Sequence, residues 1–185
     1  RYDRLRFPDE AIAPISDRVG WRTTSIRIGR EQKAELRQWC RVRQTTLVMS
    51  VFTAYVGLVL RWCNSLKGVF QYQSDGRDST EVENTIGYFA TMLYLHIEMS
   101  DADTFVDLVN RITAEYCDAY EHADYSYFAA QVPRAEFTRS TAFNWLPGEA
   151  LVNGVSASSS FDDTITCLPI SFVHPLARKL SLIHI

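Results

Sequence analysis

A polar stretch between two glycines, followed by a long apolar run, is the feature that most constrains the fold of this chain. Gly76 and Gly87 bound the polar stretch, and the run from Ile86 to Met99 is rich in aromatic and branched residues. Glycine adopts backbone angles that a side chain penalises, whereas aromatic and branched residues suit a pleated, half-buried surface. The pattern predicts a tight loop that leads into a strand over residues 86–98. It matches no common phosphate, metal or catalytic-triad signature.

Predicted strands and helices alternate along the rest of the chain. Apolar residues between positions 105 and 120 recur at i, i+3, i+4 and i+7, which predicts a helix with one apolar face. Thr45 and Thr46 offer hydroxyls that cap a buried helix over 47–62. This alternation indicates an α/β fold with helices packed on a sheet. The other expected elements are strands at 21–28, 67–74, 140–146, 165–173 and 179–185, and helices at 31–44 and 125–131.

The stretch that begins at Gly76 resembles a known family motif. Written as G-R-x-x-x-E-x-E-x-x-I-G-x-F, it is similar to the fifth core motif of nonribosomal peptide synthetase condensation domains, which continues as V-N-T. This chain departs from the motif where Thr80 replaces proline, Ala90 replaces valine, and Thr91-Met92 replaces the Asn-Thr pair. The matching residues are Gly76, Arg77, Glu81, Glu83, Ile86, Gly87 and Phe89.

Two further segments follow in the order that the family has. His122, Asp124 and Tyr125 resemble the sixth motif, His-Gln-Asp-Tyr-Pro-Phe-Glu, although Ala123 replaces its glutamine. Residues 139–145 occupy the place of the seventh motif and match it poorly. The resemblance thus covers most of the chain and is strongest over 76–128.

The histidine motif to which the family's catalysis is attributed is missing from this sequence. That motif, H-H-x-x-x-D-G, belongs to the amino-terminal lobe, and the four histidines here are isolated from one another. We therefore expect residues 1–185 to form the carboxyl-terminal lobe, without catalytic residues of its own. Residues 1–20 are expected to be a connector, and 147–173 a crossover segment that reaches the other lobe. Whether this chain alone is an enzyme stays open at this stage.

The resemblance implies one lobe of a two-lobed fold like chloramphenicol acetyltransferase, with a mixed sheet packed with helices. Substrates meet in a tunnel between the lobes, where an acceptor amine attacks a donor thioester. Both substrates are tethered by phosphopantetheine arms, and no cofactor is bound directly. The implied partners are the amino-terminal lobe, peptidyl carrier proteins and the adenylation domain. Tyr88, Thr91 and Asn144 are the residues expected to line the tunnel.

The remaining motif residues are expected to be structural. Arg77 lies among Asp78, Glu81 and Glu83 in the sequence, which predicts ion pairs that fix the loop. His122 and Asp124 are close enough to suggest a base and its orienting carboxylate, but no nucleophile has a supported place beside them. Packing or capping is the favoured interpretation of both.

Two other functions remain open from the sequence. Epimerization domains of the same synthetases share the fold and carry a Phe-Asn-Tyr-Leu-Gly segment, which Phe143-Asn144-Trp145-Leu146-Pro147 partly matches. Alternatively, the chain is a noncatalytic module that docks a carrier protein.

Composition and charge narrow the class of protein. The net charge of −3 and pI near 5.8 argue against a nucleic-acid partner. Arg37, Arg41 and Arg43 are expected on the solvated face of a helix, with the acidic surface of a carrier protein as the alternative contact.

The apolar stretch from Leu47 to Cys63 is too short and too interrupted to span a membrane. Four widely spaced cysteines predict reduced core thiols and a cytoplasmic protein.

Overall fold

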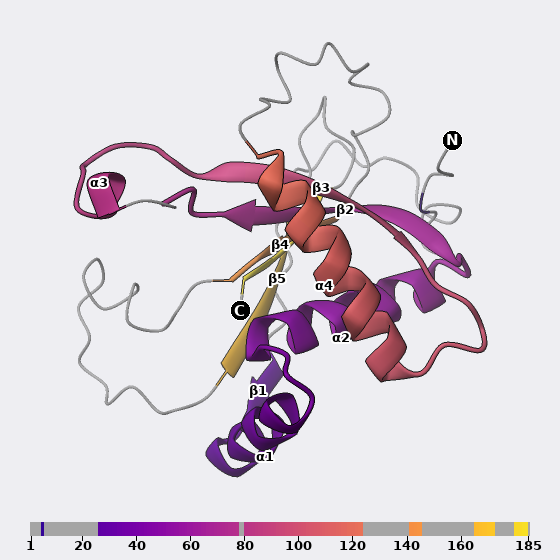
Figure 1. The fold of residues 1–185 in the computed structure, drawn as a ribbon. Helices are drawn as coiled ribbons and strands as arrows, with labels where there is room; N and C mark the ends of the chain where they lie inside the picture. Colours follow the sequence, from indigo (N-terminus) through magenta and orange to yellow (C-terminus); the bar gives the residue numbers. More distant parts are fainter. Residues whose placement is uncertain are drawn as a thin grey trace.

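The computed structural model describes residues 5, 26–77, 80–123, 141–145, 165–172 and 180–184. Its single six-stranded sheet has the order β1-β5-β6-β4-β2-β3. Helices and strands alternate in the first two-thirds of the chain (Figure 1), so the α/β prediction is confirmed. The elements are β1 (Ile26–Ile28), α1 (Arg30–Val42), α2 (Leu47–Trp62), β2 (Lys67–Ser74), α3 (Thr80–Glu83), β3 (Thr91–Glu98), α4 (Phe105–Glu121), β4 (Thr141–Asn144), β5 (Ile165–Phe172) and β6 (Leu180–His184).

The sheet is mixed, as expected. Strands β2, β4 and β6 run parallel to one another, whereas β3 pairs antiparallel with β2. On the other side, β5 pairs antiparallel with both β6 and β1. A parallel pair requires a long crossover connection. The chain between β2 and β4 includes β3 and α4, and α4 lies across the sheet (Figure 1).

Helices α2 and α4 cover one face of the sheet and form the core with it. Phe52 of α2 contacts Phe143 of β4 and Tyr72 of β2, with ring centroids 4.8 and 5.3 Å apart. Tyr72 also meets Tyr116 of α4 in an edge-to-face arrangement at 4.9 Å. Edge-to-face and tilted aromatic pairs are favourable arrangements beyond the area that they bury. The aromatic side chains therefore fix how both helices sit on β2 and β4.

Helix α2 has the bounds and the cap that the sequence predicts. The hydroxyl of Thr46 accepts a hydrogen bond from the backbone N–H of Met49 at 3.2 Å. Because this bond satisfies an N–H that has no partner within the helix, it stabilises the first turn. Phe52, Val56 and Leu60 are fully buried in the core.

Helix α4 begins in a hydrogen-bonded network of acidic residues. Thr104 and Asp107 form a reciprocal capping box, in which the Asp107 backbone N–H donates to the Thr104 hydroxyl at 3.2 Å. Asp103 accepts from the Ser100 backbone N–H at 2.7 Å and pairs with Arg111 at 2.6 Å. Buried Leu108, Val109 and Ile112 confirm the predicted apolar face of this helix.

The α4 network predicts an acid-sensitive step in stability. Hydrogen bonds from Arg111 and Ser100 lower the pKa of Asp103, and bonds from Thr104 lower the pKa of Asp107, both from an ordinary value of 3.8. Their stabilisation is complete above that value and is lost as pH falls through the lowered pKa values. We expect the melting temperature of the wild-type chain to fall in this acid range, and that of D103N/D107N to fall less. Melting temperatures are measured by circular dichroism at each pH. An equal fall in melting temperature with pH for the two proteins would contradict the assignment.

The predicted strand over 86–98 is wrong at its start, because β3 begins at Thr91. The β2–β3 pairing ends at Ser74 and Thr91, so residues 86–90 have no partner in β2. Apolar composition alone did not distinguish a paired segment from an apolar loop. The short helix α3 in this connection also had no signal in the sequence.

The cysteine prediction is confirmed only in part. Cys40, Cys63 and Cys117 are thiols, and Cys40 is buried with its sulfur 3.1 Å from the Ser50 hydroxyl. Cys117 is exposed on α4, so it is not a core residue. Within the described residues no single helix is long and apolar enough to cross a membrane; α1 and α2 pass that test only as a pair, bent by 100° at their junction.

Several predictions lie outside the described residues. The connector over 1–20 is described only at Leu5, which packs into the core. The expected helix over 125–131 falls entirely outside. Of the expected crossover over 147–173, only β5 is described. These domain boundaries stay predictions.

Candidate functional site: the Arg77 loop and the adjoining end of the sheet

Gly76 makes the turn that ends β2. Its φ is +63°, in the left-handed region that glycine tolerates, so this part of the glycine prediction is confirmed. A Cβ built on Gly76 would lie 2.1 Å from the backbone oxygen of Phe89, which no side chain permits. Gly87 does not have a positive φ, so the same prediction is wrong for it. A Cβ at Gly87 would instead press on the Phe89 ring at 3.0 Å.

Arg77 holds the following loop through backbone carbonyl groups. Its Nη1 donates to Val82, Glu83 and Thr85, with the Thr85 bond at 2.9 Å and the Glu83 bond at 3.4 Å. Its Nη2 donates to the Gly87 carbonyl at 3.4 Å. A planar guanidinium carries five N–H donors and can serve several acceptors at once. One side chain thus organises the loop from residue 82 to residue 87.

Of the ion pairs predicted for Arg77, those with Glu81 and Glu83 do not form within the described residues, and both glutamates are exposed. Asp78 lies outside the described residues. Arg77 instead places its guanidinium 4.7 Å from the centre of the Phe89 ring. The carbonyls converge on Arg77 because α3 and the turn after it curl the backbone around its side chain, which leaves the carboxylates in solvent.

The tip of this loop presents apolar side chains to solvent. Ile86 is 102% exposed and Tyr88 is 88% exposed, although both follow a turn that Arg77 anchors. In Figure 1 the α3 segment projects away from the body of the molecule. Glu81 contributes its carbonyl, which accepts a 2.8 Å bond from the Thr85 hydroxyl. The loop is thus ordered by polar contacts and apolar at its surface.

The three predicted tunnel residues lie at one end of the sheet but not on one face. Thr91 opens β3 opposite Ser74, and Asn144 closes β4 opposite Gln73. Side chains alternate between the faces of a sheet, so Thr91 shares the helix-covered face with Phe143, whereas Asn144 points to the other face. Asn144 is buried, with 8% exposed, and Tyr88 stands in the loop beyond the sheet. Their role in lining a tunnel stays a prediction.

His122 ends α4 as a cap, which agrees with the structural role expected for it. Its Nδ1 lies 2.8 Å from the Asp118 carbonyl, one turn earlier. A histidine in this place satisfies a carbonyl that the helix leaves without a partner. Asp124 and Tyr125 lie outside the described residues, so the rest of that motif stays a prediction.

The His122 cap predicts a measurable titration. The hydrogen bond to the Asp118 carbonyl, aided by the charges of Asp118 and Glu121, raises the pKa of His122 above 6.5. The protonated ring always carries a hydrogen on Nδ1 and binds the carbonyl and the nearby carboxylates more strongly than the neutral ring does, so this added stabilisation is complete below 6.5 and is lost as pH rises through the folded pKa. We expect the NMR titration midpoint of the His122 ring to lie above 6.5. A midpoint at or below that value would contradict a charged His122 cap.

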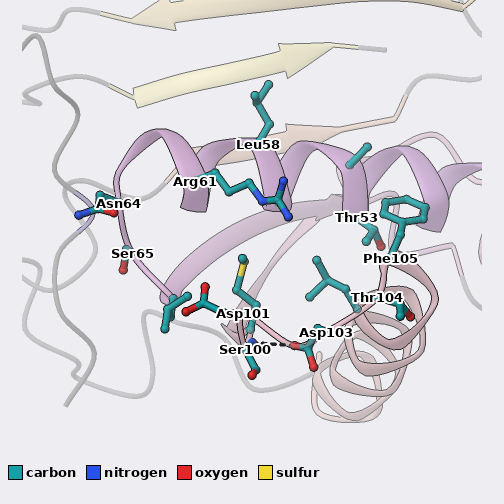
Figure 2. A pocket seen from close by; sticks show the side chains of 15 residues that line it. Thr53, Leu58, Arg61, Asn64, Ser65, Ser100, Asp101, Asp103, Thr104 and Phe105 are labelled. Atoms are coloured by element: carbon teal, nitrogen blue, oxygen red, sulfur yellow. Dashed lines mark hydrogen bonds between the residues drawn. The ribbon is translucent and has the colours of Figure 1, made fainter.

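A hollow that the sequence did not predict lies at the end of β3 away from the Arg77 loop. Its volume is about 870 Å³, and it opens between α2 and the loop that joins β3 to α4. Figure 2 shows Arg61 on the α2 side of the hollow, the Ser100–Asp103 loop on the opposite side, and the hydrogen bond between Ser100 and Asp103. Leu58, with 63% of its surface exposed, also lines it. Within the described residues no cluster of His, Cys, Asp and Glu could hold a metal ion.

Comparison with known proteins agrees with the motif at Gly76. A linear gramicidin synthase protein from Brevibacillus parabrevis is 29% identical over 136 residues, which is 73% of this chain and 3% of the synthase protein. A probable non-canonical nonribosomal peptide synthetase, CymA, from Salinispora arenicola is 29% identical over 167 residues, which is 86% of this chain and 2% of that protein. The chain therefore spans only a small part of these relatives.

Solved structures share the fold at low sequence identity. The first condensation domain of the CDA synthetase superposes with a TM-score of 0.63 and 12% identity, over 94% of this chain and 39% of that one. The cyclization-docking bidomain of EpoB from Sorangium cellulosum gives a TM-score of 0.65 and 17% identity, over 78% of this chain and 31% of that one. The condensation domain model matches residues 2–137. The resemblance seen in the Gly76 motif is thus confirmed, and the chain belongs to the condensation domain family.

Proposed function

We propose that this chain is the carboxyl-terminal lobe of a condensation domain that forms amide bonds in nonribosomal peptide synthesis. An acceptor aminoacyl amine would attack a donor thioester, with both substrates on phosphopantetheine arms of peptidyl carrier proteins. Support comes from the family match and from the share of the solved domain that the chain covers, 39% for the CDA synthetase domain. The adenylation domain of the same synthetase, in the cytoplasm, would supply the activated amino acids.

The observation that carries this proposal is the anchored but uncovered loop tip. Ile86 and Tyr88 are almost fully exposed, while Arg77 fixes the backbone beneath them. Apolar side chains held on an ordered loop mark a surface that another protein part covers. We propose the amino-terminal lobe as that part. The tunnel would then run past the same end of the sheet, where Tyr88, Thr91 and Asn144 lie.

The chemistry sets what each lobe must supply. The acceptor amine must be neutral, and an α-amino group titrates at roughly pH 8, so part of it is already neutral at pH 7. Positioning two tethered substrates then supplies much of the acceleration. Proton transfer would fall to the histidine motif of the other lobe. Among the described histidines, His96 lies exposed on β3, where it pairs with Val69 and not with a tunnel candidate, and His122 caps α4.

The proposal is tested in the intact synthetase module that contains this chain. The donor and acceptor carriers are loaded with substrate, and mass spectrometry measures the amide product. The wild-type module is compared with the I86S/Y88S variant. We expect at least a tenfold loss of product, because the lobes would no longer dock. Val42→Ser, at a residue that is 68% exposed on α1, is the matched control and should retain activity.

Three outcomes would separate the alternatives. If I86S/Y88S forms as much product as the wild type, the proposed contact of Ile86 and Tyr88 with the amino-terminal lobe is wrong. A stereochemically inverted acceptor without a new amide bond would favour an epimerization lobe. Carrier binding without any turnover would favour a docking module.

A further inference from the structure

Helix α1 separates its charges instead of pairing them. Arg30, Lys33, Arg37 and Arg41 follow one another at intervals of three and four residues, and Glu31 and Glu35 are four residues apart. Residues at these intervals share a flank of a helix. No acidic residue of α1 lies three or four positions from a basic one. The helix therefore has a basic flank and an acidic flank with no ion pair across its own turns.

The like-charged neighbours carry a small cost within the helix. Arg37 and Arg41 stand four residues apart, a spacing at which equal charges repel. Both are exposed, and among the described residues neither forms an ion pair. Arg30 and Lys33 take part in other contacts. Arg37 and Arg41 are thus the basic groups on this flank that are available to a partner.

The helix that carries these charges is held firmly on its inner side. Cys40 is buried, and its sulfur lies 3.1 Å from the hydroxyl of Ser50 in α2. Trp39 packs on Phe105 of α4 with centroids 5.6 Å apart, and Arg43 lies over the same indole at 4.6 Å. Arg43 is therefore engaged with Trp39. The basic flank is a supported surface and not a loose segment.

This flank lies apart from the proposed lobe contact. Figure 1 shows α1 beside the start of α2, well away from the projecting α3 segment. A carrier protein that delivers its phosphopantetheine arm to the tunnel must itself be held on the domain, at a surface other than the lobe contact. Arg30 and Arg41 are separated by about 16 Å along the helix axis at 1.5 Å per residue. That length suits two or three turns of a partner helix.

We propose that the basic flank of α1, through Arg37 and Arg41, docks the acidic helical surface of a carrier protein. This inference rests on the proposed function, which supplies such a partner. The complementary surface would present carboxylates at i and i+4 to the two guanidinium groups. Glu31 and Glu35 on the other flank would repel the same acids and so set the orientation in which the partner binds.

The charge pattern favours an acidic protein over other polyanions. Nucleic acid and anionic membrane require a broad basic surface that contacts many phosphates. Here the acidic flank of the same helix lies within one turn of the basic one, and the whole chain carries a net charge of −3. The narrow basic flank of α1 therefore fits a partner protein that carries a narrow row of acidic side chains.

The test uses the intact module and its own carrier domains with phosphopantetheine attached, donor and acceptor in separate titrations. In R37Q/R41Q we expect the Kd of at least one carrier to rise about 5-fold to 20-fold at low ionic strength, as for two exposed ion pairs. The rise should shrink as salt is added. Glutamine favours helix as arginine does, so α1 should persist, which circular dichroism checks.

E31Q/E35Q is the matched control, because it removes two charges from the opposite flank of the same helix. It should leave the Kd unchanged or lower it. A change of less than twofold in R37Q/R41Q for both carriers would overturn the docking proposal, and so would equal losses in both variants.

Failure of this inference is distinguishable from failure of the proposed function. If amide product forms at wild-type rate from subsaturating carrier in R37Q/R41Q, the docking proposal fails alone. If carriers bind through Arg37 and Arg41 but no amide product forms in the wild type, the docking proposal stands and the proposed function fails.

Discussion

Replacing Gly76 with alanine is expected to lower the free energy of unfolding by about 2–4 kcal/mol, the range of a strained backbone combined with a steric clash against the backbone. The φ of +63° already disfavours a side chain, and the added methyl would lie 2.1 Å from the Phe89 carbonyl oxygen. That oxygen belongs to the backbone, so it cannot rotate away. Relief requires the whole β2–β3 connection to shift. Urea titration followed by circular dichroism measures the loss.

Gly57→Ala is the matched control for this substitution. Gly57 lies inside α2, and a methyl there would meet Leu108 at an ordinary contact distance of 3.7 Å. Alanine is the better helix former, so we expect a gain of about 0.5–1 kcal/mol. Opposite signs for the two glycines would show that local geometry decides the outcome. A loss of less than 1 kcal/mol in Gly76→Ala, on the other hand, would mean that the turn is more adaptable than the structure indicates.

Long periodic segments were predictable from sequence because their signal is repeated many times. The apolar positions of α4 recur over 17 residues, and the bounds of α2 followed from an apolar run between Thr46 and Cys63. In both cases a single face or a single run had to be buried. The positive φ of Gly76 was also predictable, because a turn had to separate two strands there.

The sheet order was not predictable, since the pairing of strands is decided by contacts distant in sequence. Strand β4 has only four residues, yet it lies between β2 and β6. The error at residues 86–90 has the same origin. Ile86 and Tyr88 are residue types that are common in strands, but the pairing of β2 with β3 ends at Ser74 and Thr91, so they have no partner strand in β2. Composition describes which surface a residue suits, and the pairing decides whether that surface exists.

The candidate site shows a similar division. The motif at Gly76 indicated the family, but the neighbouring carboxylates suggested ion pairs that do not form in the described residues. Arg77 binds carbonyl groups of Val82, Thr85 and Gly87 instead. Every residue has a carbonyl, so the sequence contains no mark of which ones an arginine will bind. Only the path of the backbone through α3 shows it.

Replacing Arg77 with alanine is expected to release this loop and to abolish most of the activity of the intact module. Four backbone carbonyls would lose their donor, and the Phe89 ring would lose its cation. Because the site is partly exposed, water replaces some of these bonds, and we expect a loss of about 2–3 kcal/mol in the free energy of unfolding. Amide product should fall at least tenfold, since the tip that carries Ile86 and Tyr88 would no longer be positioned for docking.

Arg77→Lys separates the charge of this side chain from its shape. Lysine retains the positive charge, but its single ammonium cannot reach carbonyls from residue 82 to residue 87 in the planar arrangement that the guanidinium provides. We therefore expect lysine to recover less than half of the lost stability, and hydrogen exchange of residues 82–89 to stay fast. Full recovery by lysine would assign the effect to charge alone, because an ammonium group would then hold the loop as well as the fork of donors does.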